Sequence, residues 1–346
     1  MRRKRRRARA LVSLRWPPWQ QGARLVAGAL LLLAGLGGCA SLVPQTMALR
    51  EAWPAGVALS SENAGVPFFP QQDYQCGPAA LATVLVAGGV KLSPDDLVKS
   101  VYLPARQGSL QVEMLAAPRR YGRVAYPLAP RFDALLQEVA AGNPVVVLQD
   151  TGVGPLVNWH YAVVVGFDYP AGELYLRSGE TRRLALPFTV FEYTWKRGGY
   201  WAMVALPPER IPASADAAGY LAAVAAMERV AAPEAALLAY ATALRRWPDN
   251  ATASIGLANR QYAQGALAAA EATLRHALAQ HPDAVPVLNN LAQVLSDLGR
   301  NDEALALLER AVRADASPEA SPEASPFAAA VRETRALVLQ RMGRSR

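Results

Sequence analysis

The sequence has no acidic residue in its first 38 positions, although nine arginines and lysines lie there. Removing those nine basic residues would change the net charge of +8 to −1. The excess of positive charge therefore belongs to the N-terminal stretch and not to the rest of the chain, so we expect no nucleic-acid partner.

Two signals of bound groups are also missing. The sequence contains no glycine-rich phosphate loop, and no set of histidine, cysteine and acidic residues has the spacing of metal ligands. We therefore expect no cofactor and no metal. Hydrophobic residues make up 52% of the chain, which excludes disorder as its main state and is enough for one or two packed cores.

The N-terminus is typical of an export signal. A basic region ends at Arg24, and the apolar run at 25–36 is shorter than the roughly 20 residues of a transmembrane helix. Leu-Gly-Gly then precedes Cys39, in a pattern that resembles the lipobox of bacterial lipoproteins. The resemblance implies a signal peptide at 1–38 and a lipid on Cys39. A plain secretory signal that contains a cysteine is the alternative.

The residue two places after the cysteine, Ser41, bears on the destination. In Gram-negative lipoproteins a residue other than Asp in this place usually implies sorting to the outer membrane. We therefore expect an outer-membrane lipoprotein that faces the periplasm, contacts the membrane through the lipid on Cys39, and has a tether at 39–62.

Cys76 is the second of only two cysteines, so it has no partner for an internal disulfide if Cys39 carries lipid. Pro78, the apolar run at 79–87 and the two glycines after it predict a buried helix with Cys76 at its start. The positive end of a helix dipole favours a thiolate, so we expect a lowered thiol pKa. A buried and inert cysteine is the alternative.

A thiolate nucleophile needs a base, and the chain has three histidines. His276 and His281 lie in a helical C-terminal region and are expected at the surface. His160 opens the run HYAVVVGFD, which predicts a buried strand. A histidine at the start of a strand is usually structural, but its pairing with a lone thiol favours a catalytic role.

The segments QCGPAALATVL and HYAVVVGFD resemble the bacteriocin-processing cysteine peptidases, which cut after double-glycine leaders and have a papain-like fold. The resemblance implies Cys76 as nucleophile, His160 as general base and Gln71 as donor to the oxyanion. Papain-like enzymes place this glutamine six residues before the cysteine, where Pro70 stands here, so Gln72 remains an alternative. Double-glycine substrates are not implied, because they are processed during export from the cytoplasm.

The family also has an aspartate that orients the histidine. Asp168 does not suit this role, because eight residues of strand place it about 26 Å from His160. A tight turn at 169–172 would instead return the chain beside His160, with Ser178 at the place of the aspartate. Glu180 and Asn158 remain alternatives. A weak orienting group would lower the rate and could mean that the fold serves binding only.

A repeat of 34 residues marks the C-terminal region. Small residues recur at 236, 270 and 304 and at 243, 277 and 311, large apolar residues at 240, 274 and 308, and glycines at 265 and 299. This pattern resembles about three tetratricopeptide repeats, at 212–316. An irregular alanine-rich bundle is the alternative. The run SPEASPEASP predicts a linker at 317–326, followed by a capping helix and tail at 327–346.

The sequence thus predicts an α+β papain-like cysteine peptidase domain at 63–208, followed by an all-α tetratricopeptide-repeat solenoid. The expected function is a lipid-anchored periplasmic cysteine peptidase that hydrolyses peptide bonds, with repeats that recruit a substrate or protein partner on their concave face. A catalytically weak or inactive adaptor that binds peptides or proteins is one alternative. Acyl or amide transfer by the same thiolate is another.

Overall fold

The computed structural model of the chain describes residues 42–71, 75–315 and 326–344. The expected signal peptide, Cys39, Gln72 and the linker after residue 316 lie outside these ranges.

The chain divides into two compact units, residues 1–53 and 54–346. In the first unit the structure describes helix α2 (Pro44–Glu51), which lies within the segment expected to be a tether. Among the described helices, none has the length and apolar character needed to cross a membrane.

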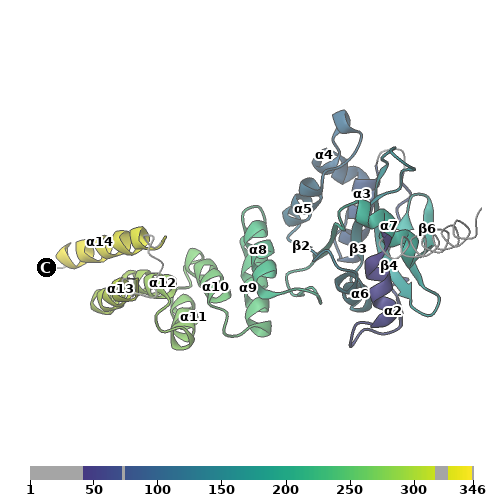
Figure 1. The fold of residues 1–346 in the computed structure, drawn as a ribbon. Coiled ribbons are helices and arrows are strands. Elements are labelled where there is room, and N and C mark those ends of the chain that lie inside the picture. The colour runs from purple at the N-terminus through teal and green to yellow at the C-terminus, as the bar shows by residue number, and fades with distance from the viewer. Residues whose placement is uncertain (1–41, 72–74, 316–325, 345–346) are drawn as a thin grey trace, which may run out of the picture. The chain divides into compact units, whose positions relative to one another are not determined.

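An antiparallel sheet forms the centre of the N-terminal part of the second unit (Figure 1). In the described residues its strand order is β2-β7-β3-β4-β5-β6, and β1 pairs with the C-terminal end of β4. The strands are β1 (Ser60–Glu62), β2 (Val124–Pro127), β3 (Val145–Asp150), β4 (Trp159–Asp168), β5 (Glu173–Ser178), β6 (Thr181–Pro187) and β7 (Ala202–Leu206). The predicted strand that begins at His160 is confirmed as β4, which is a central strand of the sheet.

Helices cover both faces of this sheet. They are α3 (Cys76–Ala87), α4 (Pro94–Val101), the short 3₁₀ helix η1 (Pro104–Arg106), α5 (Gln111–Arg120), α6 (Phe132–Ala140) and α7 (Phe188–Arg197). Val146 and Leu148 of β3 pack in one core cluster with residues of α3. Their neighbours Val145 and Val147 point to the opposite face, because side chains alternate along a strand. Helices α6 and α7 contact the sheet there.

Helix α3 is buried because it is apolar on every side. Nine of its twelve residues are buried, and Gly88 and Gly89 end it, with Gly89 at a φ of +85° that favours glycine. Helix α4 begins at a capping box, in which Asp96 Oδ2 accepts hydrogen bonds from the backbone N–H of Ser93 at 2.8 Å and from its hydroxyl at 2.9 Å. Helix α3 was predicted from the sequence.

The C-terminal part is a row of helices (Figure 1). Three pairs precede a last helix: α8 (Ala217–Glu228) with α9 (Pro233–Arg246), α10 (Ala251–Ala263) with α11 (Leu267–Gln280), α12 (Val285–Asp297) with α13 (Asn301–Asp315), and α14 (Ala328–Arg344). The nine positions of the 34-residue pattern at 236–311 are all buried. The small ones let paired helices approach closely, while Gly265 and Gly299 form turns at φ of +77° and +80°. The fold class is therefore α+β followed by an all-α solenoid.

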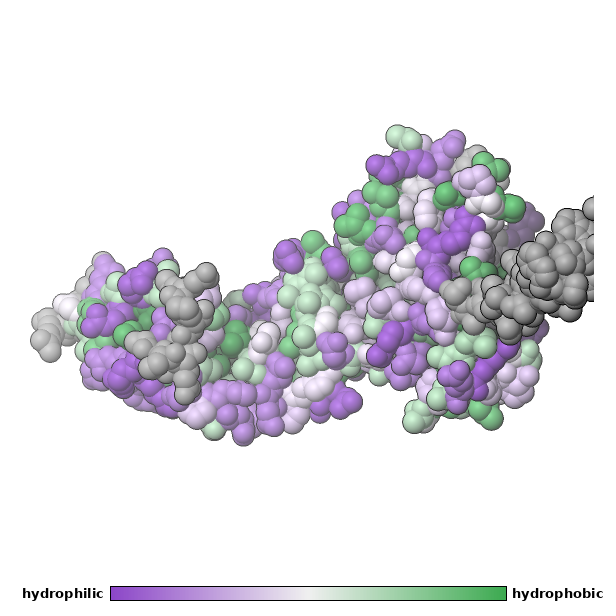
Figure 2. Space-filling model, viewed as in Figure 1, coloured by the Kyte–Doolittle hydropathy of each residue, from purple (hydrophilic) through white to green (hydrophobic). Residues whose placement is uncertain are grey.

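The outer surface of the repeat helices is charged. Arg275 and Arg300 form ion pairs with Glu271 and Glu303, across the neighbouring helices α11 and α13. Figure 2 shows hydrophilic residues over much of this region. These pairs are exposed, so each contributes little to stability, and they keep this side of the helices in water.

Candidate active site

Cys76 is the first residue of α3, and Gln75 is the N-cap. Pro78 lies in the first turn, where a missing backbone N–H breaks no hydrogen bond within the helix. Cys76 is a free thiol, half-buried against the core between α3 and the sheet. The helix N-terminus thus presents the thiol together with backbone N–H groups that have no partner within the helix.

The surroundings of Cys76 favour the neutral thiol. Burial raises the pKa of the Cys76 thiol, although the backbone amides of Tyr161, Gly77 and Cys76 itself act to lower it. The prediction that the helix dipole lowers the pKa of the Cys76 thiol is therefore wrong. A helix N-terminus does stabilise a thiolate, but loss of water around the half-buried sulfur costs more.

His160 lies at the start of β4, and its ring Nε2 is 2.8 Å from the hydroxyl oxygen of Ser178. The turn after β4 brings β5 back antiparallel, which places Ser178 at this position, as predicted. Asn158 instead donates from Nδ2 to Thr151 Oγ1 at 2.9 Å, and Glu180 is exposed. Of the three groups considered for orienting His160, Ser178 is the one that forms a hydrogen bond with it.

The contact with Ser178 leaves Nδ1 as the ring nitrogen available to the thiol. Burial lowers the pKa of His160, and no charge opposes the effect. No hydrogen bond joins the Cys76 sulfur and the imidazole in the part of the chain that the structure describes. Burial therefore favours the neutral thiol and the neutral imidazole over a thiolate–imidazolium ion pair.

Gln71 binds across the end of β5. Its backbone N–H donates to Gly179 O at 3.1 Å, and its Oε1 accepts from Gly179 N at 3.2 Å. Its Nε2 donates to Tyr161 O at 3.2 Å. The side-chain amide has a second N–H, so it can still donate to a substrate while these bonds hold it in place. Gln72 is outside the described residues.

One cleft contains the thiol, the imidazole and the amide. It has a volume of about 1050 Å³, and Gln71, Cys76 and His160 are among the residues that line it. Most of its other lining residues come from three segments: 106–111 between η1 and α5, 157–159 where β4 begins, and 197–199 where α7 ends. Within the described residues no cluster of three or more His, Cys, Asp or Glu could hold a metal ion.

An ion pair that sequence reasoning missed holds the β3–β4 loop at this cleft. Arg197 Nη2 lies 2.6 Å from Asp150 Oδ2, and Arg197 Nη1 donates to Gly152 O at 2.8 Å. Asp150 Oδ1 accepts from the backbone N–H groups of Gly152 and Asn158, at 2.9 Å each. These residues lie at the ends of β3 and α7, and nothing in the sequence pairs them, because the contact depends on how the helix crosses the sheet.

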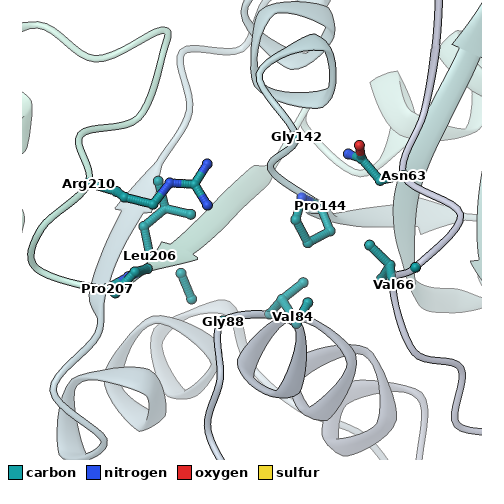
Figure 3. Close-up of a pocket in the computed structure, with 12 residues that line it drawn as sticks. Asn63, Val66, Val84, Gly88, Gly142, Pro144, Leu206, Pro207 and Arg210 are labelled. Atoms are coloured by element: carbon teal, nitrogen blue, oxygen red, sulfur yellow. The ribbon is translucent and has the colours of Figure 1, made fainter.

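A second, smaller pocket lies at the other end of α3, with a volume of about 290 Å³ (Figure 3). Val84 and Gly88 of α3 form one side, with Pro144 before β3 and Leu206 at the end of β7 on others. Arg210 lines it and donates to Asn143 Oδ1. The pocket is thus separated from Cys76 by the length of the helix.

Comparisons with known proteins agree with this architecture. Residues 63–202 match the family model of the peptidase C39-like family, and residues 261–321 match that of the tetratricopeptide repeat. No curated protein matches the chain.

Three solved structures are each similar to a part of the chain. A C39-like peptidase from Bacillus anthracis is 17% identical over 42% of this chain and 97% of its own, with a TM-score of 0.36. A tetratricopeptide-repeat protein from Thermus thermophilus is 26% identical over 38% of this chain and 66% of its own, with a TM-score of 0.28. MamA is 16% identical over 38% of this chain and 80% of its own, with a TM-score of 0.27.

Proposed function

Since the chain consists of a peptidase C39-like domain followed by tetratricopeptide repeats, we propose that it is a cysteine peptidase with Cys76 as nucleophile and His160 as general base. The observation that supports this most is the convergence of thiol, imidazole and glutamine amide in one cleft, with the imidazole oriented by Ser178. Such a set is sufficient for acyl transfer.

The proposed reaction has two steps. Cys76 Sγ attacks the peptide carbonyl carbon while its proton passes to Nδ1 of His160. The developing oxyanion accepts from the backbone N–H of Cys76 and the second amide N–H of Gln71. The C–N bond then breaks, and His160 gives its proton to the leaving amine. The acyl group stays on Cys76 as a thioester. Water attacks the thioester after giving a proton to His160, and a carboxylic acid and the free thiol result.

Ser178 sets the protonation state from which this reaction starts. When the Ser178 hydroxyl accepts a hydrogen bond from Nε2–H, Nδ1 is a base, but a hydroxyl can also donate to Nε2, and it carries no charge to stabilise an imidazolium. We therefore propose that the thiol is deprotonated only as it attacks, by proton transfer within the substrate complex. This resting state predicts a slow enzyme compared with one that has a preformed ion pair.

Peptide cleavage by the full chain, purified in detergent, tests this proposal. Wild type is expected to cleave members of a peptide library detected by mass spectrometry, and Cys76→Ala and His160→Ala are each expected to lose the activity. Equal cleavage by Cys76→Ala would end the proposal.

A second candidate function is a module that binds peptides without cutting them. The neutral Ser178 beside His160, together with the directions of the thiol and imidazole pKa values, favours it. It predicts that Cys76→Ala binds peptides as wild type does and that wild type releases no products. Transfer of the acyl group to another amine would pass through the same thioester on Cys76. It would be detected as a new amide product.

We further propose that a lipid on Cys39 anchors the chain to the outer membrane, facing the periplasm. The lipobox-like pattern before Cys39 and Ser41 after it support this. The repeats, a protein-interaction architecture, would then recruit a substrate or partner protein on their concave face. Labelling of wild type but not of Cys39→Ala with radioactive palmitate, followed by membrane fractionation, tests the anchor.

A further inference from the structure

The loop between β3 and β4, residues 151–158, carries no charged residue. Several of its apolar side chains are exposed: Val153 by 82%, Leu156 by 73% and Val157 by 56%. Trp159, which follows the loop, is 54% exposed. Monomeric proteins rarely leave a group of large apolar side chains uncovered, so this surface indicates a binding role.

Hydrogen bonds and close packing support this apolar loop. Besides the contacts that Arg197 and Asp150 make with it, Thr151 N–H donates to Asn158 O at 2.9 Å across its base. A Cβ at Gly152 would lie 1.8 Å from Leu156 O, so the loop backbone packs closely on itself. The exposed apolar side chains are therefore presented by a rigid support, which lowers the entropic cost of binding.

The apolar loop continues directly into the proposed active-site cleft. Val157 and Trp159 line the cleft next to His160. A substrate that reaches Cys76 would therefore lie along these apolar side chains, because they form the wall of the same cleft. Residues 106–111 line the same cleft.

The segment 106–111 contributes one arginine to the cleft. Arg106 lines the cleft from η1, is exposed, and makes no ion pair with any of the described residues. Arg197, which pairs with Asp150, is the other charged residue among the described residues of the lining, and none of these described residues is a carboxylate. Among the described residues, the cleft lining therefore combines an arginine without an ion pair and an exposed apolar surface, which complements a peptide with an acidic side chain and a bulky apolar one.

From these features we infer that the cleft selects extended peptides that place a large apolar side chain against Val157 and Trp159 and a carboxylate near Arg106. This inference rests on the proposed function for the position of the substrate, and it adds the substrate class. An apolar contact of this size and a charge pair are each expected to change affinity about tenfold.

Four fluorescein-labelled decapeptides test the inference by fluorescence anisotropy. They combine Phe or Ser at one central position with Glu or Lys at a neighbouring one, and the protein is the full chain in detergent carrying Cys76→Ala, so that nothing is cleaved. The Phe/Glu peptide should bind about tenfold tighter than the Ser/Glu and the Phe/Lys peptides. Equal binding of all four would overturn the inference.

Two variants assign the preferences to their residues. Trp159→Ser should remove the difference between Phe and Ser, and Arg106→Gln the difference between Glu and Lys. Matched controls on the repeats, Val312→Ser and Arg313→Gln, change similarly exposed side chains on α13 and should leave both differences intact. The inference is overturned if the controls act like the cleft variants. It is also overturned if Trp159→Ser leaves peptide binding intact but reduces sedimentation with phosphatidylglycerol vesicles, which would assign the loop to a lipid surface.

The same peptides separate this inference from the proposed function. If wild type cleaves all four at equal rates, hydrolysis stands and the substrate class is wrong. If the preferences are present but wild type cleaves none of the four, the substrate class stands as a binding specificity and the proposed hydrolysis fails.

Discussion

Replacing Ser178 by Asp would place a negatively charged carboxylate beside His160, where this chain has a neutral hydroxyl. Ser178 Oγ lies 2.8 Å from His160 Nε2, so a carboxylate on the same strand position would contact the imidazole directly. A negative charge there favours the imidazolium, which in turn favours a thiolate on Cys76. We expect Ser178→Asp to raise the pKa of His160 and to lower that of the thiol.

The size of the effect follows from the geometry. Unit charges about 4 Å apart interact by about 4 kcal/mol at an effective dielectric constant of about 20. His160 and Ser178 are half-buried, so part of this energy is lost in removing water from the new carboxylate. About 1.4–2.7 kcal/mol remains, which corresponds to one to two pH units at His160 and about a tenfold gain in thiolate at pH 7.

Two measurements check this prediction on the full chain in detergent. The His160 resonance, assigned by its absence in His160→Ala, gives the imidazole pKa by NMR titration, and iodoacetamide gives the rate of thiol alkylation against pH. Ser178→Asn is the control, because its amide has a similar size and no charge. If the Asp and Asn variants titrate alike, the argument that Ser178 determines the protonation state is refuted.

Three further predictions concern reactivity and stability. Because burial raises the pKa of Cys76, its alkylation rate in wild type should keep rising with pH through neutrality and level off only above about 8.5, the value of a free thiol. Gly77→Ala should cost about 1–3 kcal/mol in urea unfolding, since its Cβ would lie 2.2 Å from Ser109 Oγ, and adding Ser109→Gly should recover most of the loss. Asp150→Asn should cost about 3 kcal/mol and expose the loop at 151–158 to proteolysis, because Arg197 loses its buried partner.

Each of these has an outcome that would contradict it. An alkylation rate that levels off near neutral pH would mean that a thiolate already exists. A Gly77→Ala chain as stable as wild type, or no recovery with Ser109→Gly, would mean that the two residues are not in contact. Unchanged proteolysis of Asp150→Asn would show that other contacts hold the loop.

Much of the fold follows from local patterns. The 34-residue spacing of Ala236, Ala270 and Ala304 predicted the solenoid because each of these positions must be small for two helices to pack, and all three are fully buried. The apolar run before Gly88 predicted α3, and the run that begins at His160 predicted β4. In each case one period or one run of side chains determines the element.

Other features depend on contacts between distant segments. Strand β6 lies at a sheet edge and is mostly exposed, so its burial pattern marks it only weakly as a strand. The predicted direction of the Cys76 pKa shift was wrong. Burial of the thiol raises the pKa more than the helix N-terminus lowers it, and no local sequence pattern reports that burial. The contact of Ser178 with His160 was predicted only as one of three choices, since it depends on the register of the β4–β5 hairpin.

The most direct test of the central proposal is to look for the thioester on Cys76. The full chain would be mixed with a Phe/Glu peptide p-nitrophenyl ester, quenched in acid within seconds, and its intact mass determined. The account predicts an adduct of the acyl mass on wild type that maps to Cys76 and disappears with time, and no adduct on Cys76→Ala. A wild-type chain that stays unmodified while it binds the peptide would contradict the peptidase and leave a binding module.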